Sequence, residues 1–436
     1  MGKYFGTDGI RGDATSKVTP TLAYSVGNTL RKALNMNQLV IGMDTRPTSA
    51  MLSVRLAHGA IMGGMEVWNA YVLSTPMIAH YSKLRGIVGA MITASHNVHT
   101  DNGIKIFVKG FKTTPDEEAK IEKLMAANQV IKLPIHTVKN GNDDVKIQYL
   151  QIYKKLKLEK IDLKAIFDTA NGATSSITKE ILDLYVPNAL QIYKHEGINT
   201  LINDHCGSTH METMIKEVLK KKYPVGFSFD GDGDRIQAVD ATGRIYDGDM
   251  IVYMIANHMK QNGTLANNGV VLTKMSNLGI IKALKDKGID VVLSDVGDKN
   301  VSLAMEEHGY CIGGESSGHV ILSQFIHTGD GLLVSMYLMK ILNDTKKWFD
   351  ELTKDVKLYP IEHVNISEVP KETLKKDSVQ NYLIKLKEKL GEDSLLLVRP
   401  SGTENLIRVT VSHPDESMVK NSTKDLVSFI LKEGEK

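Results

Sequence analysis

A pattern of apolar strand, small-polar loop, amphipathic helix and second strand recurs three times along the chain. The three copies begin at the strand-like segments 39–43, 165–167 and 270–273. Each of these segments is a short run of mostly apolar residues, which is typical of a strand in a mixed or parallel sheet covered on both faces. The repeat therefore predicts three related α/β domains.

The last part of the chain breaks this pattern. Two strand-like runs, 395–398 and 406–411, flank a tight Pro-Ser-Gly-Thr loop, so a separate α+β domain is expected at the end of the chain. A chain of 436 residues also exceeds the size at which a single core keeps growing. The predicted class is α/β, with three related mixed-sheet domains and a C-terminal α+β domain. The expected boundaries are 1–150, 151–247, 248–357 and 358–436.

Composition excludes several classes of protein. With 53 Lys and Arg against 51 Asp and Glu, the net charge is +2, so nucleic acid is not an expected partner. The two cysteines, Cys206 and Cys311, form no Cys-x-x-Cys motif, which argues against a disulfide framework or a zinc knuckle. No apolar run reaches the roughly 18 to 20 residues of a membrane span, and the N-terminal segment lacks the apolar core of a signal peptide. We therefore expect a cytoplasmic protein without a membrane partner.

Ser95 follows the apolar run 89–92 and would lie at the carboxyl end of a buried strand. Open α/β sheets bind their ligands at this edge. A turn serine that caps the next segment is the plainer alternative. No Gly-x-Ser-x-Gly elbow surrounds Ser95, which disfavours a Ser-His-Asp hydrolase and favours a serine that carries a phosphoryl group. Lys105, in the following segment, is a candidate proton donor or charge partner for the same loop.

An acidic string follows a second apolar run, 225–229; its carboxylates belong to Asp230, Asp232 and Asp234. Alternation places these side chains on one side of an extended segment, and the intervening glycines let the backbone curl so that the oxygens converge. An EF-hand is excluded, because Arg235 and Ala241 stand where that loop needs Gly and Glu. The string predicts a Mg²⁺ site completed by a phosphate oxygen on Ser95, with an acidic surface turn as the alternative.

Two further strings offer groups for a sugar and for an anion. In the first, alternation lets three side chains face one cavity and hydrogen-bond vicinal hydroxyls; they are Glu315, Ser317 and His319. A Gly-rich turn with a solvated histidine is the alternative. The second is a tight loop suited to a phosphate dianion, formed by Arg399, Ser401, Gly402, Thr403 and Arg408. It lacks the Gly-x-x-x-x-Gly-Lys pattern of a nucleotide-binding loop. Arg11 is either a further cation at the reacting phosphate or a surface arginine. Together these strings predict an enzyme that moves a phosphoryl group on a sugar.

With these motifs in order, one in each expected domain, the chain resembles the α-D-phosphohexomutase superfamily. Within it, the chain is most similar to the bacterial phosphoglucosamine mutases, through segments 3–12, 296–298 and 328–332. The resemblance implies four domains around a central cleft. It also implies an isomerase that interconverts glucosamine 6-phosphate and glucosamine 1-phosphate, and so supplies UDP-N-acetylglucosamine synthesis.

The resemblance further implies the groups that carry the reaction. Ser95 would rest as a phosphoserine, and a hexose 1,6-bisphosphate would be intermediate and activator. Mg²⁺ would be held by that phosphate with the three aspartates, and Lys105 and His319 would be the acid and base candidates. Sugar hydroxyls would be bound by Glu315 and Ser317.

Four positions depart from the usual pattern of the subgroup: Val98, Lys299, Ser316 and Asn405. None removes a group that the reaction needs, but Lys299 and Ser316 lie in segments that choose the sugar. Glucose or mannose phosphate therefore stays an alternative substrate. A Mg²⁺-dependent sugar phosphatase and a catalytically silent sugar-phosphate sensor are further alternatives. The expected partner is a small sugar phosphate, and the sequence leaves the oligomeric state open, a homodimer included.

Overall fold

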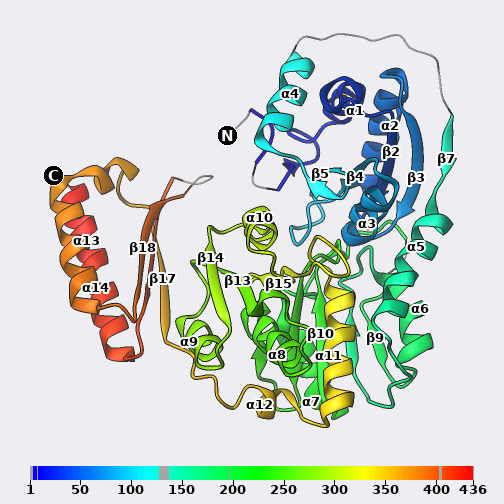
Figure 1. Ribbon diagram of the computed structural model, residues 1–436. Helices are drawn as coiled ribbons and strands as arrows, with labels where there is room; N and C mark the ends of the chain where they lie inside the picture. The colour runs from blue at the N-terminus through cyan, green and yellow to red at the C-terminus, as the bar shows by residue number, and fades with distance from the viewer. Residues whose placement is uncertain (1–2, 7, 127–136, 196, 402–404, 436) are drawn as a thin grey trace. The chain divides into compact units, whose positions relative to one another are not determined.

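The computed structural model describes residues 3–6, 8–126, 137–195, 197–401 and 405–435. The chain divides into two units. A main unit comprises residues 1–274 and 290–352, and a C-terminal unit comprises residues 275–289 and 353–436. Figure 1 labels many of the elements of both units.

The first sheet of the main unit has seven strands among the described residues, in the order β1-β5-β4-β2-β3-β7 with β6 paired to β5. Its strands are β1 (Ile10–Asp13), β2 (Gln38–Met43), β3 (Glu66–Val72), β4 (Val88–Ile92), β5 (Asp101–Val108), β6 (Phe111–Lys112) and β7 (Val138–Asn140). The helices of this region are α1 (Pro20–Leu34), α2 (Ser49–Met62), α3 (Thr75–Arg85), α4 (Pro115–Ala126) and α5 (Asn142–Lys155). Strand β2 pairs in parallel with β3 and β4, whereas β5 runs antiparallel to β4 and β1, so the sheet is mixed.

Two smaller sheets complete the main unit, with the orders β12-β11-β10-β8-β9 and β14-β13-β15-β16. The strands of the second sheet are β8 (Ile166–Asp168), β9 (Leu190–Ile192), β10 (Val225–Phe229), β11 (Ile236–Asp240) and β12 (Ile245–Tyr246). Those of the third are β13 (Gly269–Thr273), β14 (Asp290–Ser294), β15 (Ile312–Gly314) and β16 (Val320–Leu322). The helices are α6 (Ser175–Tyr185), α7 (Met211–Lys221), α8 (Gly248–Gln261), α10 (Asp298–His308), α11 (Gly331–Thr345) and α12 (Phe349–Leu352), with a 3₁₀ turn at Ala266–Asn268.

The C-terminal unit has an antiparallel three-stranded sheet in the order β17-β19-β18. It comprises β17 (Ile361–Ile366), β18 (Leu395–Pro400), β19 (Ile407–Ser412), α9 (Leu278–Asp286), α13 (Asp377–Leu390), α14 (Glu416–Gly434) and a 3₁₀ turn at Lys371–Lys375. Helices α13 and α14 lie side by side along this sheet (Figure 1). Strand and helix residues share one apolar core, which includes Val379, Val409 and Leu426. This unit therefore has a core of its own.

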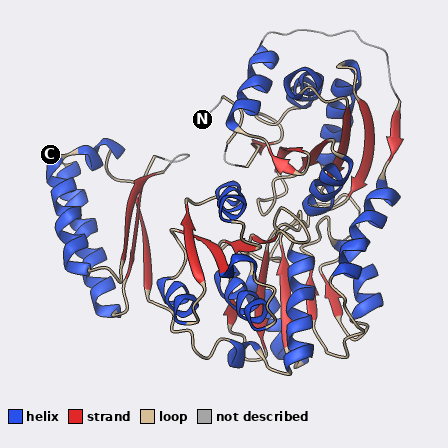
Figure 2. Cartoon of the chain, in the orientation of Figure 1, coloured by secondary structure: helices blue, strands red, loops and turns tan. Residues whose placement is uncertain are grey.

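The predicted fold class is confirmed. Three sheets of mixed or parallel character alternate with helices, and an antiparallel sheet with its helices follows (Figure 2). The third copy of the repeat has one unexpected feature, because its helix, α9, belongs to the C-terminal unit while its strands belong to the main unit. Within the described residues, no helix is long and apolar enough to cross a membrane.

The sequence motifs lie where strands end. Strand β4, buried along its whole length, leads to Ser95, and β10, equally buried, leads to Asp230. The segment 315–319 connects β15 to β16, and the C-terminal loop connects β18 to β19. The fold thus presents each motif on a short connection between two strands.

Candidate active site

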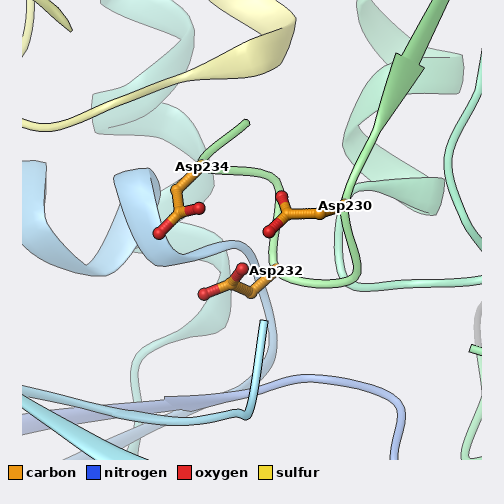
Figure 3. A group of neighbouring side chains, drawn as sticks. All are labelled: Asp230, Asp232 and Asp234. Carbon is orange, nitrogen blue, oxygen red and sulfur yellow. The ribbon is translucent and has the colours of Figure 1, made fainter. Parts of the chain in front are cut away.

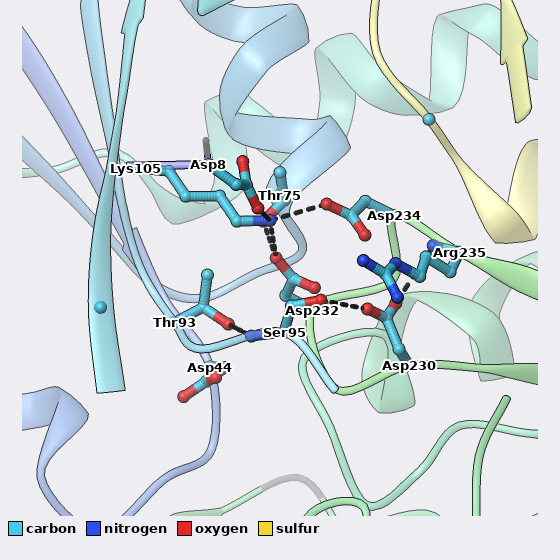
Figure 4. Close-up of polar contacts among 12 residues, drawn as sticks. Asp8, Asp44, Thr75, Thr93, Ser95, Lys105, Asp230, Asp232, Asp234 and Arg235 are labelled. Atoms are coloured by element: carbon cyan, nitrogen blue, oxygen red, sulfur yellow. Dashed lines mark hydrogen bonds and ion pairs between the residues drawn. The ribbon is translucent and has the colours of Figure 1, made fainter. Parts of the chain in front are cut away.

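Ser95 is buried in the loop after β4 and has a left-handed backbone, with φ of 55°. Its amide donates to Thr93 Oγ1 at 2.8 Å. Its hydroxyl Oγ donates to Asp230 Oδ2 at 2.6 Å and lies 3.2 Å from His96 Nδ1 (Figure 4). Burial, followed by the charges of Arg235 and Arg11, lowers the pKa of His96 to about 4, so this ring is neutral at neutral pH. The serine hydroxyl is therefore directed at a carboxylate that comes from another sheet.

The three aspartates converge, as the alternation predicts. Asp230, Asp232 and Asp234 are buried, and each offers an oxygen within 4.8 Å of the others' (Figure 3). Gly233 makes the turn between them with φ of 77°, a conformation that residues with a Cβ rarely adopt. Burial, and then the charges of Asp234 and Asp232, raise the pKa of Asp230 well above its usual value. The loop therefore gathers three carboxyl groups in a buried site, where their charged forms disfavour one another.

Lys105, on β5, is 2% exposed and supplies positive charge to this loop. Its Nζ donates to Asp232 Oδ2 at 2.8 Å and to Asp234 Oδ2 at 2.7 Å, and lies 3.2 Å from Asp8 Oδ2 (Figure 4). Burial opposes its charge, but the three carboxylates outweigh burial and raise the pKa of Lys105 well above its usual value. In the same way burial opposes the charges of Asp8 and Asp234, yet Lys105 holds the pKa of both well below the usual value.

The aspartate loop fits a small divalent cation. Asp232 Oδ1 and Asp234 Oδ1 are buried, and neither accepts a hydrogen bond from any described residue. The nearest ring nitrogen, His319 Nδ1, lies 3.7 Å from Asp234 Oδ1. Buried carboxylate oxygens without donors are costly unless a cation binds them. A donor set made only of carboxylate oxygens suits Mg²⁺ rather than a soft metal.

Asp8 extends the cluster and was missed by the sequence analysis. Its carboxylate contacts Lys105, accepts from Arg11 Nη2 at 2.6 Å, and pairs with Lys112. Arg11 stands on β1, opposite Gly103 of β5, which explains how it reaches the same place as Lys105. The structure therefore places Arg11 at the cluster, where its guanidinium pairs with Asp8. The contacts of Asp8 with Lys105 and Lys112 join residues that lie far apart along the chain, so no local pattern marks them.

His319 joins the cluster from the third sheet. Its ring is 4% exposed, and Nε2 lies 3.1 Å from Asp298 Oδ2, whose other neighbour is Lys112. Burial opposes a charged ring, but Asp298 and Asp234 together raise the pKa of His319. The Gly329 amide also points at Nε2, at 3.0 Å, and this contact favours the neutral ring. Two carboxylates outweigh one amide dipole, so the ring holds a second proton more readily than a free histidine does.

The other two residues of the predicted sugar motif make different contacts. Glu315 Oε1 accepts from the Gly297 amide at 2.8 Å, which ties it to the start of α10. Ser317 Oγ is buried and has no hydrogen-bond partner among the described residues. Gly318 has φ of 93°, and a Cβ there would meet Ile236 O at 2.0 Å, so this loop packs directly against β11. The close packing places the sugar motif beside the aspartate loop.

Arg235 is a further residue that the sequence analysis missed. Its backbone N–H donates to Asp230 Oδ1 at 3.1 Å, and its guanidinium lies among the aspartates in Figure 4. The charges of Asp230 and Asp234 outweigh burial and raise its pKa. Its Nε is buried and donates to no described residue. Its position directly after the acidic string was the only available signal.

Two arginines face each other in the C-terminal unit. Arg399 on β18 and Arg408 on β19 are cross-strand partners, and both line a cavity of about 290 Å³ with His363 and Asn365. Like charges directly opposite each other on a sheet are destabilising, and an anion between them removes this cost. Ser401 is buried and its carbonyl accepts from the Lys371 ammonium, a cation absent from the sequence motif. Gly402 and Thr403 lie outside the described residues.

Family models match nearly the whole chain. Residues 2–131, 147–243 and 247–359 match the phosphoglucomutase/phosphomannomutase alpha/beta/alpha domains I, II and III, and residues 364–427 match the C-terminal domain of the same family. The phosphoglucosamine mutase of Bacillus cytotoxicus is 40% identical, over 99% of this chain and 98% of the relative. That of Bacillus cereus is 41% identical, over 96% of each chain.

Solved structures share the fold at low identity. A phosphoglucomutase/phosphomannomutase family protein from Burkholderia thailandensis superposes with a TM-score of 0.80 at 19% identity, over 97% of this chain and 96% of that one. Aspergillus fumigatus N-acetylphosphoglucosamine mutase, in complex with GlcNAc-6P and magnesium, gives 0.70 at 16% identity, over 99% and 96%. The likeness covers all four sheets of the described chain.

Replacing Lys105 with Met is expected to lower the free energy of unfolding by about 3–5 kcal/mol near neutral pH, because two buried carboxylates, Asp232 and Asp234, and the partly buried Asp8 lose a shared cation. The lowered pKa values of Asp8 and Asp234 make this contribution fully present above about pH 4, and it is lost as the pH falls further. Urea unfolding at about pH 7 and about pH 3 measures the deficit, which should shrink at the lower pH. The exposed Lys120→Met is the control, and equal stability of K105M and wild type at neutral pH would contradict the ion-pair account.

Proposed function

The chain belongs to the phosphoglucomutase/phosphomannomutase family, and we propose that it interconverts glucosamine 6-phosphate and glucosamine 1-phosphate through a phosphoserine at Ser95. The reaction class is an isomerisation by phosphoryl transfer. The observation that carries the proposal is the contact of Ser95 Oγ with Asp230, at 2.6 Å, inside a buried cluster of carboxylates and cations. A serine hydroxyl in this position is placed to act as a nucleophile. The charged groups around it are of the kind that stabilise a phosphoryl group during its transfer.

The reaction consists of two balanced transfers. In the first, the P–O bond to Ser95 Oγ breaks and a new P–O bond forms to the free hydroxyl of the sugar phosphate. The proton of that hydroxyl passes to a base, and Ser95 regains a proton. The product is a hexose 1,6-bisphosphate. Its other phosphoryl group then returns to Ser95 by the reverse chemistry, so the enzyme ends as it began.

Mg²⁺ would be held by Asp230, Asp232 and Asp234 together with an oxygen of the phosphoserine. When bound, it neutralises charge on the transferring phosphoryl group. The fit rests on the two buried aspartate oxygens that accept no hydrogen bond from described residues. Arg235 and Arg11, both beside the same loop, add positive charge at the reacting phosphate.

Lys105 and His319 are the proposed proton-transfer groups. Both have raised pKa values in their carboxylate surroundings, so both hold protons that they can donate to a departing sugar oxygen. They reach the cluster from different sheets, Lys105 on β5 and His319 before β16. Two donors on different elements suit a substrate that reacts in two orientations.

The C-terminal loop would bind the phosphate that is not reacting. Arg399 and Arg408 supply paired guanidinium groups, and Ser401, Gly402 and Thr403 would add hydroxyls and amides. In the main unit, Glu315 and Ser317 would bind sugar hydroxyls. The amine of glucosamine is a cation, and a carboxylate such as that of Glu315, which accepts from the Gly297 amide at the start of α10, would suit it.

Purified protein is expected to carry phosphate on Ser95, seen as a phosphate-sized addition in its intact mass. Ser95→Ala should remove this addition and lower mutase activity by several orders of magnitude, roughly as the loss of other catalytic nucleophiles does. Ser53→Ala is the matched control, since the hydroxyl of this buried serine has no hydrogen-bond partner among the described residues. Near-normal turnover by S95A would remove the mechanism.

Asp232→Asn is expected to weaken Mg²⁺ binding at least about tenfold, because an amide is a poorer ligand than a carboxylate for a hard cation. Isothermal titration with MgCl₂ measures the affinity, and thermal unfolding monitors the fold. The exposed Asp204→Asn serves as the control. Unchanged Mg²⁺ affinity together with a large loss of stability would mean that the aspartate loop is structural.

A comparison of hexose phosphates tests the proposal that glucosamine phosphate is the substrate. Glucosamine 6-phosphate should exceed glucose 6-phosphate and mannose 6-phosphate in kcat/KM by at least about tenfold, or roughly 1.4 kcal/mol of transition-state binding. Release of inorganic phosphate should stay far slower than isomerisation. Equal or faster turnover of glucose or mannose phosphate would reassign the substrate, and phosphate release at the rate of isomerisation would indicate a phosphatase.

A further inference from the structure

The backbone at Ser95 is strained. Its φ of 55° lies in the left-handed region, which is unfavourable for a residue with a Cβ and persists only where the surroundings impose it. The loop around it contains no glycine between residues 90 and 102. The conformation also determines where Oγ points, because it directs the hydroxyl at Asp230. Some group must therefore hold the loop in this shape.

Arg46 makes contacts of the kind required. Its side chain is fully buried, and its guanidinium donates to one carboxylate and to backbone carbonyls between Ser95 and Asp101. Nη2 donates to Ser95 O at 2.9 Å and to Asn97 O at 2.8 Å. Nη1 donates to Asp101 O at 3.1 Å and to Val98 O. One planar group thus fixes four carbonyls of a single loop.

Arg46 is itself held in place. Its Nε donates to Asp44 Oδ2 at 2.8 Å, and its own amide donates to Asp44 Oδ1 at 3.1 Å. Ser49 Oγ donates to the same carboxylate at 2.7 Å. These residues follow β2, which pairs in parallel with β4, the strand that leads to Ser95. The two strand ends are therefore neighbours, and the guanidinium only has to cross from one to the other.

A second donor reaches the same carbonyls from the second sheet. Asn203 Nδ2 donates to Ser95 O at 2.8 Å and to Asn97 O at 3.1 Å. The backbone N–H of Asn203 donates to Ala170 O at 3.0 Å, in the loop after β8. Ser95 O thus receives two hydrogen bonds, one from each of two sheets. The carbonyl is fixed relative to the sheet that carries Asp230.

We propose that Arg46 is a positioning residue for phosphoryl transfer, and that Asn203 assists it. Arg46 holds the Ser95 loop in its left-handed conformation, so that Oγ faces Asp230 and the aspartate loop. It touches neither substrate nor the reacting atoms, and it acts through backbone carbonyls. The inference rests on the proposed role of Ser95 as the phosphoryl carrier. It assigns a function to the 44–46 segment, which no catalytic group occupies.

If the proposal is right, substitution of Arg46 lowers turnover but leaves substrate binding nearly unchanged. In Arg46→Lys the ammonium can pair with Asp44 but cannot reach four carbonyls in one plane. Displacement of a nucleophile by about 1 Å costs on the order of 100-fold in rate. We therefore expect kcat to fall about 10–100-fold while KM for glucosamine 6-phosphate stays within about twofold. Asn203→Asp, which keeps the shape and the tolerance of positive φ but replaces the donor with an acceptor, should lower kcat in the same way.

The experiment measures phosphorylation of Ser95 directly. Dephosphorylated wild type, R46K and N203D are mixed with glucose 1,6-bisphosphate and MgCl₂, and the gain of phosphate is followed by intact mass. Each rate is divided by the folded fraction, from near-ultraviolet circular dichroism. The exposed Arg55→Lys is the control and should match wild type. Slow phosphorylation by folded R46K and folded N203D, with near-normal KM, supports the proposal.

Other results overturn it. If folded R46K and N203D gain phosphate as fast as wild type, the two residues do not position Ser95. If the phosphorylation rates of R46K and N203D equal that of wild type once they are divided by the folded fraction, Arg46 and Asn203 contribute only to stability. If wild type itself gains no phosphate while remaining folded, the proposed function fails, and the positioning role fails with it.

Discussion

The structure of the main unit depends on the balance of buried charge around Lys105. Its ammonium lies between carboxylates at 2.7, 2.8 and 3.2 Å, and it is almost completely shielded from water. In such surroundings each charge is costly without its partners. Because Lys105 belongs to the first sheet and Asp232 and Asp234 to the second, neither sheet can bury its charged residues alone. The site can therefore assemble only when the two sheets pack together.

The same constraint reaches the third sheet. Asp8 pairs with Lys112, Lys112 with Asp298, and Asp298 with His319, whose ring returns to Asp234. The contacts form a closed circuit in which each carboxylate lies between cations. Such a circuit fixes the protonation of its members, since the raised pKa values of Lys105 and His319 arise from carboxylates on other elements. Groups proposed to move protons are thus tuned by the contacts that join the sheets.

The sequence predicted what local patterns encode. Buried strands are short apolar runs, and Ser95 and the Asp230 string follow such runs directly, so the fold class, the family and the convergence of the aspartates were predicted and are confirmed. Asp8, Lys112 and Arg46 were not assigned to the site. Each acts through partners brought close by sheet order and register, such as β2 beside β4. The left-handed backbone at Ser95 could not be predicted either, because a serine in the sequence, unlike a glycine, gives no indication of a positive φ.

Electrostatics links the proposed phosphoserine to the proposed cation. The carboxyl groups of Asp230, Asp232 and Asp234 are buried together, and burial with the neighbouring charges raises the pKa of Asp230. A phosphoryl group on Ser95 Oγ, which lies 2.6 Å from Asp230, would add a further charge of about −1.5 to −2 to this buried cluster. A divalent cation on the aspartate loop would offset that added charge. Each of the two proposed groups would therefore favour the presence of the other, because each compensates charge that the other leaves unbalanced beside Ser95.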